Sequence, residues 1–152
     1  MPQSLSQVYV HVVFSTKDRR PVLTHDLRAD VTRVITGTIN RHGGRADAIG
    51  MVADHVHVLL ALARTRSIAE MIQQIKVASS RWVNGLEQSN GEMPFHWQRG
   101  YGAFSVSVSS LSAVRRYINT QEQRHEALSF EDEFRGLLVR HKLTWDERYV
   151  WD

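Results

Sequence analysis

The chain has 152 residues, enough for a single domain with a substantial core, and it contains no cysteine. The lack of thiols excludes disulfides, cysteine catalysis and cysteine-ligated zinc. A net charge of +3 permits an anionic partner without demanding one. No apolar run approaches the ~20 residues of a membrane span, and the N-terminus lacks the basic start of a secretory signal, so we expect a cytoplasmic protein with no membrane partner.

The first half of the chain predicts a strand, a helix and then two more strands. Apolar residues alternate along the first strand, so that four of them share one face: Val8, Val10, Val12 and Phe14. Thr24 is expected to cap a helix that continues to about His42, where a glycine pair ends it. Two strands follow, at about 46–52 and 55–62, with a turn between them.

The second half predicts helices on either side of one more stretch of strand. A capping-box pattern at Ser67 opens a helix that continues to about Asn84. Residues 95–109 are typical of one or two strands bent at their glycines. Two helices follow, one over about 110–127 and one that begins at about 129.

This order of elements predicts an α+β fold. Strand, helix, two strands, helix and strand form the ferredoxin-like, or RRM-like, arrangement, which is an antiparallel sheet with helices on one face. C-terminal helices are added to this core. We expect one domain over 1–152, with a core at about 5–108, a helix at about 110–127, and a C-terminal helix and tail at about 129–152.

Two histidines interrupt the apolar run ADHVHVLLAL, which covers residues 53–62. Because side chains alternate along a strand, His55 and His57 point to one face, ~7 Å apart, while Val56 and Val58 point into the core. We expect both imidazoles on the open face of the sheet, where they can converge on a divalent cation. The alternative is a pair of solvent-facing histidines without a ligand.

The segment YINTQ, residues 117–121, offers a third ligand and a nucleophile. On one continuous helix, Tyr117 and Gln121 are surface neighbours at i and i+4. A glutamine carbonyl can coordinate a hard cation, and an activated tyrosine hydroxyl can attack a phosphodiester beside that cation. The alternative is that Tyr117 only packs on the helix surface.

These features together resemble the HUH single-tyrosine transposases of small bacterial insertion sequences, the TnpA-like enzymes. The pair of histidines on a strand, followed by Tyr-x-x-x-Gln on a helix, carries the resemblance. Further blocks agree with that family in order along nearly the whole chain: HVVFSTKDRRPVL, DHVHVLL, KVASSRW, FHWQRGYGAFSVS, YINTQEQRH and DERYVWD. H-x-H or Y-x-x-x-Q alone is a weak motif, whereas the ordered set is specific.

The resemblance implies an enzyme that cleaves and rejoins single-stranded DNA ends that carry hairpins. Tyr117 would attack the scissile phosphate and form a 5′-phosphotyrosine link, releasing a 3′-hydroxyl. Mg²⁺ or Mn²⁺ would be held by His55, His57 and Gln121. The family works as a homodimer, in which the helix that carries the tyrosine can complete the partner's site.

Contacts with DNA are expected to depend mainly on charge, because basic residues are concentrated in 17–45, 64–81 and 98–116. A solvated basic surface is the alternative. The candidates for phosphate contacts are Arg19, Arg20, Lys76 and Arg81. The candidates for stacking on unpaired bases are Trp82, Trp97 and Tyr101. The sequence identifies no general base, although His96 and His125 are candidates.

Other functions remain open from the sequence. A domesticated relative would keep the same residues but act on dispersed genomic repeats. A replication-initiation protein or relaxase would share the chemistry, usually in a larger chain. A non-catalytic ferredoxin-like module that binds nucleic acid would use the basic helices and the aromatic residues, but would have no use for the histidine pair. A structural dimer would have incidental histidines.

Overall fold

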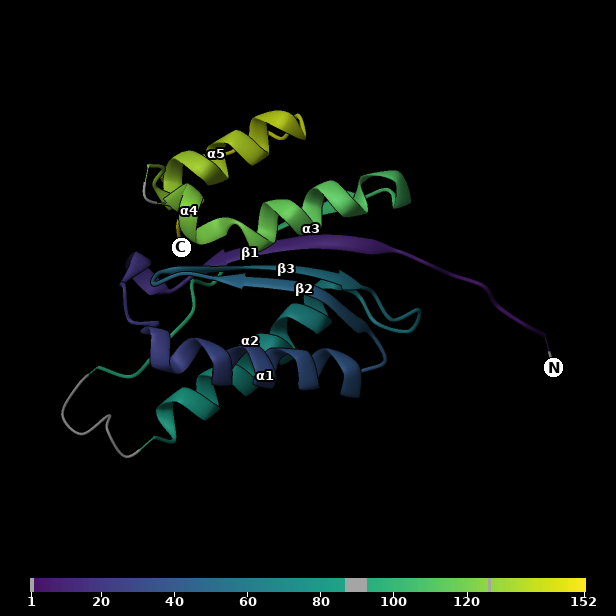
Figure 1. The fold of residues 1–152 in the computed structure, drawn as a ribbon, viewed down its shortest axis with the longest axis horizontal. Helices are drawn as coiled ribbons and strands as arrows, with labels where there is room; N and C mark the ends of the chain where they lie inside the picture. Colours follow the sequence, from purple (N-terminus) through teal and green to yellow (C-terminus); the bar gives the residue numbers. More distant parts are fainter. Residues whose placement is uncertain (1, 87–92, 126) are drawn as a thin grey trace.

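A four-stranded antiparallel sheet forms the centre of the protein in the computed structural model, which describes residues 2–86, 93–125 and 127–152 (Figure 1). The strands are β1 (Tyr9–Ser15), β2 (Arg45–Met51), β3 (His55–Ala61) and β4 (Gly102–Val106). Their order in the sheet is β2-β3-β1-β4, so the first strand lies between the third and the fourth. The predicted α+β class with an antiparallel sheet is confirmed.

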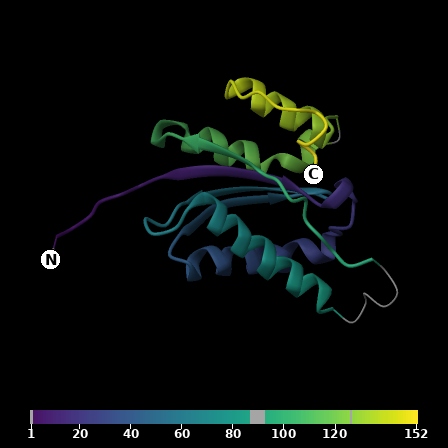
Figure 2. The same cartoon turned by 180° about the vertical axis from the view of Figure 1, so that it is seen from behind.

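Two long helices, α1 (His25–Arg41) and α2 (Ile68–Asn84), cover one face of this sheet (Figures 1 and 2). Val10, Val12 and Phe14 point into the core beneath them, as the alternation predicted, although Val8 precedes the strand and is exposed. The capping box at the start of α2 is present. There the backbone N–H of Glu70 donates to Ser67 Oγ at 3.1 Å.

Three further helices, α3 (Leu111–Asn119), α4 (Gln121–His125) and α5 (Phe130–Arg140), cover the opposite face (Figure 1). One apolar cluster joins α5 to β1 and β4, and another joins α3 to β1 and β3. The expectation that the histidine face of the sheet is open is therefore wrong, because the C-terminal helices bury it. Short 3₁₀ turns at Lys17–Arg19 and Val108–Ser110 complete the described elements.

The helix that was expected over about 110–127 is two helices in the structure. The chain leaves the helical conformation at Thr120, with φ −104° and ψ 20°, and α4 begins at the next residue. The Thr120 hydroxyl donates to the carbonyl of Arg116 at 2.8 Å, a bond between side chain and backbone that competes with the helical pattern. Tyr117 and Gln121 consequently lie on opposite sides of a break.

The C-terminal tail folds back against the segment that precedes β4. The carbonyl of Asp152 accepts hydrogen bonds from the backbone N–H of Gly100 at 2.8 Å and from Gln98 Nε2 at 3.3 Å. Trp151 packs with the aromatic cluster of α5. Within the described ranges, no helix combines the length and the apolar character that crossing a membrane requires.

Candidate functional site

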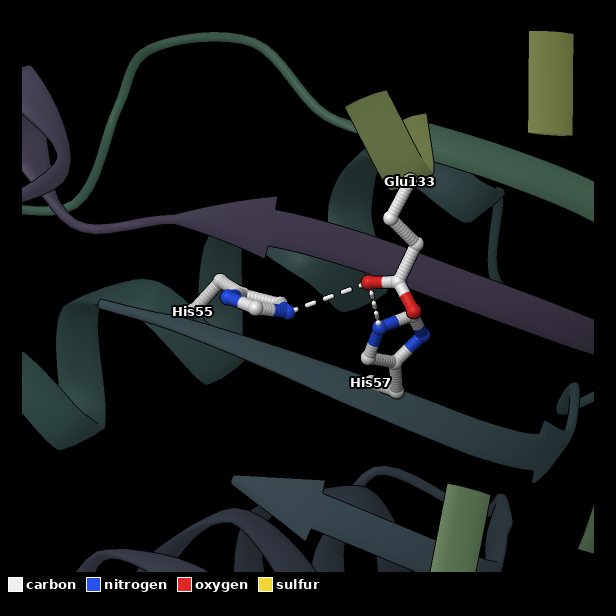
Figure 3. Close-up of side chains that lie close together, drawn as sticks. All are labelled: His55, His57 and Glu133. Carbon is white, nitrogen blue, oxygen red and sulfur yellow. Dashed lines mark hydrogen bonds and ion pairs between the residues drawn. The ribbon is translucent and has the colours of Figure 1, made fainter. Parts of the chain in front are cut away.

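His55 and His57 converge on one carboxylate, that of Glu133 on α5 (Figure 3). Glu133 Oε1 lies 3.1 Å from His55 Nε2 and 2.8 Å from His57 Nε2. Both histidines are fully buried, and Glu133 is only 4% exposed. As predicted, the two imidazoles share a face of β3, and the candidate ligand atoms of the three residues lie within 4.8 Å of one another.

The pattern of α5 explains why a glutamate points into the interior. Ser129 caps the helix, because its Oγ accepts a bond from the N–H of Asp132 at 3.2 Å. Phe130, Phe134 and Leu137 form its buried face, and residue 133 lies on the same side. A charge in an apolar stripe is costly unless it finds partners, and here the histidines supply them. That position in the stripe was the sequence signal for Glu133, which the sequence analysis missed.

Each histidine also contacts a second polar side chain through its other ring nitrogen, Nδ1. His55 Nδ1 lies 2.7 Å from Asp54 Oδ1, and His57 Nδ1 lies 2.8 Å from His11 Nε2 on β1. Burial opposes protonation of His55, but hydrogen bonds to Asp54 and Glu133 outweigh it, so its pKa is raised. Burial, with His57 nearby, lowers the pKa of His11 to about 3, so that His11 is neutral at physiological pH.

Tyr117 donates its hydroxyl proton to the other oxygen of the same carboxylate. The distance from Tyr117 Oη to Glu133 Oε2 is 2.5 Å. Arg124 of α4 lies over the phenol, with its guanidinium carbon 3.5 Å from the ring centroid, and Nη1 donates to the Tyr117 carbonyl at 2.8 Å. Burial and the bond to Glu133 raise the pKa of Tyr117 above that of an ordinary phenol.

Gln121, the predicted third ligand, is buried beside this cluster. Neither Oε1 nor Nε2 of its amide has a hydrogen-bond partner among the residues that the structure describes. The amide lies against Gly50 of β2, whose absent Cβ would stand 2.5 Å from Gln121 Oε1. Gly50 pairs with His57 across the strands. A buried amide without partners is costly, and so the Gln121 amide is a candidate to bind a group that the described residues do not provide.

The donor set fits a divalent cation. Two imidazole nitrogens and a carboxylate oxygen are the ligands that Mn²⁺ and related first-row ions accept in proteins, and the outer partners of both histidines are typical of metal sites. His55, His57 and Glu133 would hold such an ion. The unpartnered amide oxygen of Gln121 stays a predicted further ligand.

The predicted DNA-contacting residues lie outside this cluster, and two of them are already engaged. Arg19 Nε pairs with Glu131 Oε1 at 2.8 Å. Lys76 Nζ donates to three backbone carbonyls, those of residues 98, 99 and 100, at 2.8, 3.1 and 2.8 Å. Arg20 lines a cavity of about 450 Å³ between α1, α2 and the segment before β4, and Arg81 is exposed on α2.

Among the candidates for base stacking and for a general base, some are buried and others are accessible. Trp97 is buried, and its Nε1 donates to Ser79 Oγ at 2.9 Å, so it is not accessible to a base. Trp82 packs against the core, whereas Tyr101 is exposed beside Lys76. His96 lines the 450 Å³ cavity, away from Tyr117, and the side chain of His125 lies outside the described part of the chain.

Comparison with known proteins found a similar curated sequence, similar solved structures and a matching family model. The ISDra2 transposase TnpA of Deinococcus radiodurans is 22% identical over 121 residues, which are 78% of this chain and 86% of that relative. A solved structure from Deinococcus radiodurans R1, assigned as a transposase, superposes with a TM-score of 0.64 at 20% identity, over 80% of this chain and 95% of that one. A REP-associated tyrosine transposase bound to a REP hairpin superposes with a TM-score of 0.62 at 13% identity, over 84% of this chain and 74% of that one.

At these identities, the two structures show that the fold is shared. The family model described as "Transposase IS200 like" matches residues 4–121, which include the histidine pair, the tyrosine and the glutamine. Glu133 and α5 lie beyond the matched segment. Since the match covers most of the chain, this protein belongs to the IS200-like transposase family.

Proposed function

We propose that this protein is a metal-dependent tyrosine transposase that cleaves and rejoins single-stranded, hairpin-bearing DNA ends. The observation that carries the proposal is the convergence of Tyr117, His55 and His57 on the two oxygens of Glu133. One oxygen faces the two ring nitrogens, and the other faces the phenol. The proposed nucleophile and the proposed cation site therefore share one carboxylate. The membership of the chain in a transposase family supports assigning these roles.

In the proposed cleavage step, Tyr117 Oη attacks the scissile phosphorus, and the bond from phosphorus to the 3′-oxygen breaks. The phenol proton passes to Glu133 Oε2, the acceptor 2.5 Å away, and the leaving 3′-oxygen takes a proton from solvent water to become a hydroxyl. The product is a 5′-phosphotyrosine. A 3′-hydroxyl later attacks that link, which restores the phenol and rejoins a strand without a nucleotide cofactor.

The residues around the phenol prepare this step. Arg124 holds the backbone and ring of Tyr117, which limits the freedom that the phenol would otherwise lose on binding DNA. Its guanidinium also lies near the charge that develops on the phenol oxygen. A bound Mg²⁺ or Mn²⁺ would supply charge neutralisation at the phosphate oxygens. His55, His57 and Glu133 would hold it, with Gln121 as a further ligand.

The substrate and the assembly follow from the resemblance to the family. The REP-associated transposase is described as bound to a REP hairpin, which supports hairpin-bearing single strands as the substrate class here. We further propose a homodimer, an active site that the partner can complete, one catalytic domain over residues 1–152, and action in the cytoplasm. The same neighbour favours, as a second candidate, a domesticated enzyme that acts on genomic repeats.

Covalent capture tests this function. Protein is mixed with Mn²⁺ and a labelled hairpin oligonucleotide with a single-stranded extension, and adducts are separated under denaturing conditions. The wild type should form an adduct, and Tyr117→Phe should form none while its DNA binding survives. Tyr149→Phe, which changes an exposed phenol elsewhere, is the matched control and should react normally. An adduct on Tyr117→Phe would refute the nucleophile, and none on the wild type would favour a non-catalytic binding module.

A further inference from the structure

We infer that the cavity between β4, α3 and α5 binds the nucleotide at the scissile phosphate, with Arg140 as the cation that contacts that phosphate. This inference rests on the proposed function. The cavity has a volume of about 510 Å³, within the range of pockets that hold small organic ligands. Tyr117 and His11 lie on its wall, so it leads directly to the predicted nucleophile.

Position is the first argument. Tyr117 is only partly buried, and it lines this cavity but not the cavity of about 450 Å³. The other, of about 450 Å³, lies by α1 and α2 and has no wall in common with it. A phosphate bound in the cavity between β4, α3 and α5 would therefore lie beside Tyr117.

Charge is the second argument. Arg140 and His141 line the α5 end of this cavity, and both are exposed. Arg140 forms no ion pair with a described residue, whereas Arg135, five residues earlier on α5, pairs with Asp132 and Glu147. A guanidinium that is free at a cavity mouth is available for the bidentate contact that arginine makes with phosphate.

The remaining walls fit the rest of a nucleotide. His141 stacks on Phe104 with ring centroids 4.5 Å apart and an interplanar angle of 23°, which makes a flat aromatic surface beside Arg140. Nucleobases stack on such surfaces irrespective of their sequence. Ser107 and Ser110, in the turn before α3, also line the cavity, and serine hydroxyls can contact sugar and phosphate oxygens. One cavity therefore offers a cation, a stacking surface and hydroxyls next to the phenol.

The salt dependence of binding separates a phosphate contact from a general structural effect. Affinity for the hairpin oligonucleotide is measured over a range of salt concentrations in a Tyr117→Phe background, where cleavage cannot interfere. Loss of one phosphate contact should make the slope of log affinity against log salt shallower by about 0.7. Arg140→Gln should show this change, and Arg140→Lys, which keeps the charge, should recover most of the wild-type slope.

Arg41→Gln is the matched control, because Arg41 is also an exposed arginine in the last turn of a helix, but on α1, across the sheet. It should leave the slope unchanged. A second arm replaces the scissile phosphate by a neutral methylphosphonate. The methylphosphonate should weaken binding by the Tyr117→Phe protein in which Arg140 is intact. In the protein that also carries Arg140→Gln, it should cause little further loss of affinity. Equal slopes for Arg140→Gln and Arg41→Gln, or fully additive losses in the second arm, would overturn the inference.

The two proposals fail separately. If the wild type forms its covalent adduct but Arg140→Gln does not change the salt dependence of binding, the nucleotide site is wrong and the transposase function stands. If no adduct forms but Arg140→Gln changes the slope, the cavity binds DNA and the catalytic proposal is wrong. Melting temperatures of the variants confirm that each is folded before its slope is compared.

Discussion

His11 Nε2 and His57 Nδ1 lie 2.8 Å apart across the central pair of strands, β1 and β3. His11 is neutral, since burial and the neighbouring His57 lower its pKa to about 3, and so its ring can accept a hydrogen bond. If His57 Nε2 held a cation, Nδ1 would carry the proton and donate a hydrogen bond to His11. His11 therefore orients the ring of His57, a role that its place at the start of the block HVVFSTKDRRPVL did not reveal.

Replacing His11 should weaken the metal site without removing a ligand. We expect His11→Phe to lower the affinity for Mn²⁺ by about 10–100-fold, which is the usual effect of losing such an outer partner. Titration calorimetry with Mn²⁺ measures this directly. His11→Gln keeps an acceptor and should recover part of the loss, and His42→Phe, at the end of α1, is the control. Equal affinity in His11→Phe and the wild type would show that His57 needs no support.

The third ligand is decided by comparing Glu133→Gln with Gln121→Ala. In the wild type, Mn²⁺ at 100 times its dissociation constant should stabilise the fold by about 2.7 kcal/mol. We expect Glu133→Gln to lose most of this gain, because a neutral amide replaces the carboxylate that faces both histidines. Thermal melts with and without Mn²⁺, compared within each variant, provide the measurement. If only Gln121→Ala loses the gain, the amide supplied the third ligand and Glu133 did not.

The sequence predicted most of the elements, because the long segments had both a period and an end signal, although only residues 102–106 of the strand stretch expected over 95–109 form a strand. Ser67 and Glu70 form their capping box, and α2 ends at Asn84 as predicted. What the periodicity could not anticipate was Thr120, whose hydroxyl bonds to the backbone and divides one expected helix into two. A single threonine in a helical pattern is common, and only the observed geometry shows that the helix ends there.

The candidate site was predictable only where the strand period fixed it. Alternation on β3 put His55 and His57 on one face, which the structure confirms. The apolar stripe of α5 indicates that residue 133 points inward, but Glu133 is 76 residues from His57 in sequence, and only the packing of α5 on the sheet brings the two together. His11 was missed for a related reason, since its contact with His57 depends on how β1 and β3 pair.

A pair of glycine substitutions tests how closely α3 and α4 must approach the sheet. A Cβ at Gly50 would stand 2.5 Å from the Ile118 carbonyl and from Gln121 Oε1, so Gly50→Ala should destabilise the fold by about 1–3 kcal/mol and reduce adduct formation. Gly136 on α5 has no described atom within 4 Å of its would-be Cβ, so Gly136→Ala should instead stabilise by about 1 kcal/mol. Urea unfolding measures both. Equal effects would show that the approach at Gly50 is not tight.

Acid should release the C-terminal tail from α5 before it disturbs the sheet. Arg135 donates to Glu147, and Trp145 and Trp151 donate to the same carboxylate, so the pKa of Glu147 is lowered from 4.5 to about 2. A carboxylate with a lowered pKa stabilises the folded state fully above its ordinary pKa. That contribution is then lost as the pH falls toward about 2.

Tryptophan fluorescence between pH 5 and 2 follows this release, because two of the four tryptophans contact Glu147. The wild type should show a change in emission within this window. Glu147→Gln should show little further change there, since its amide does not titrate. Glu122→Gln on α4, an exposed carboxylate paired only with Arg28 in the described structure, is the control and should behave like the wild type. An identical acid transition in Glu147→Gln would mean that other carboxylates hold the tail, and that α5, with Glu133 on it, does not depend on this anchor.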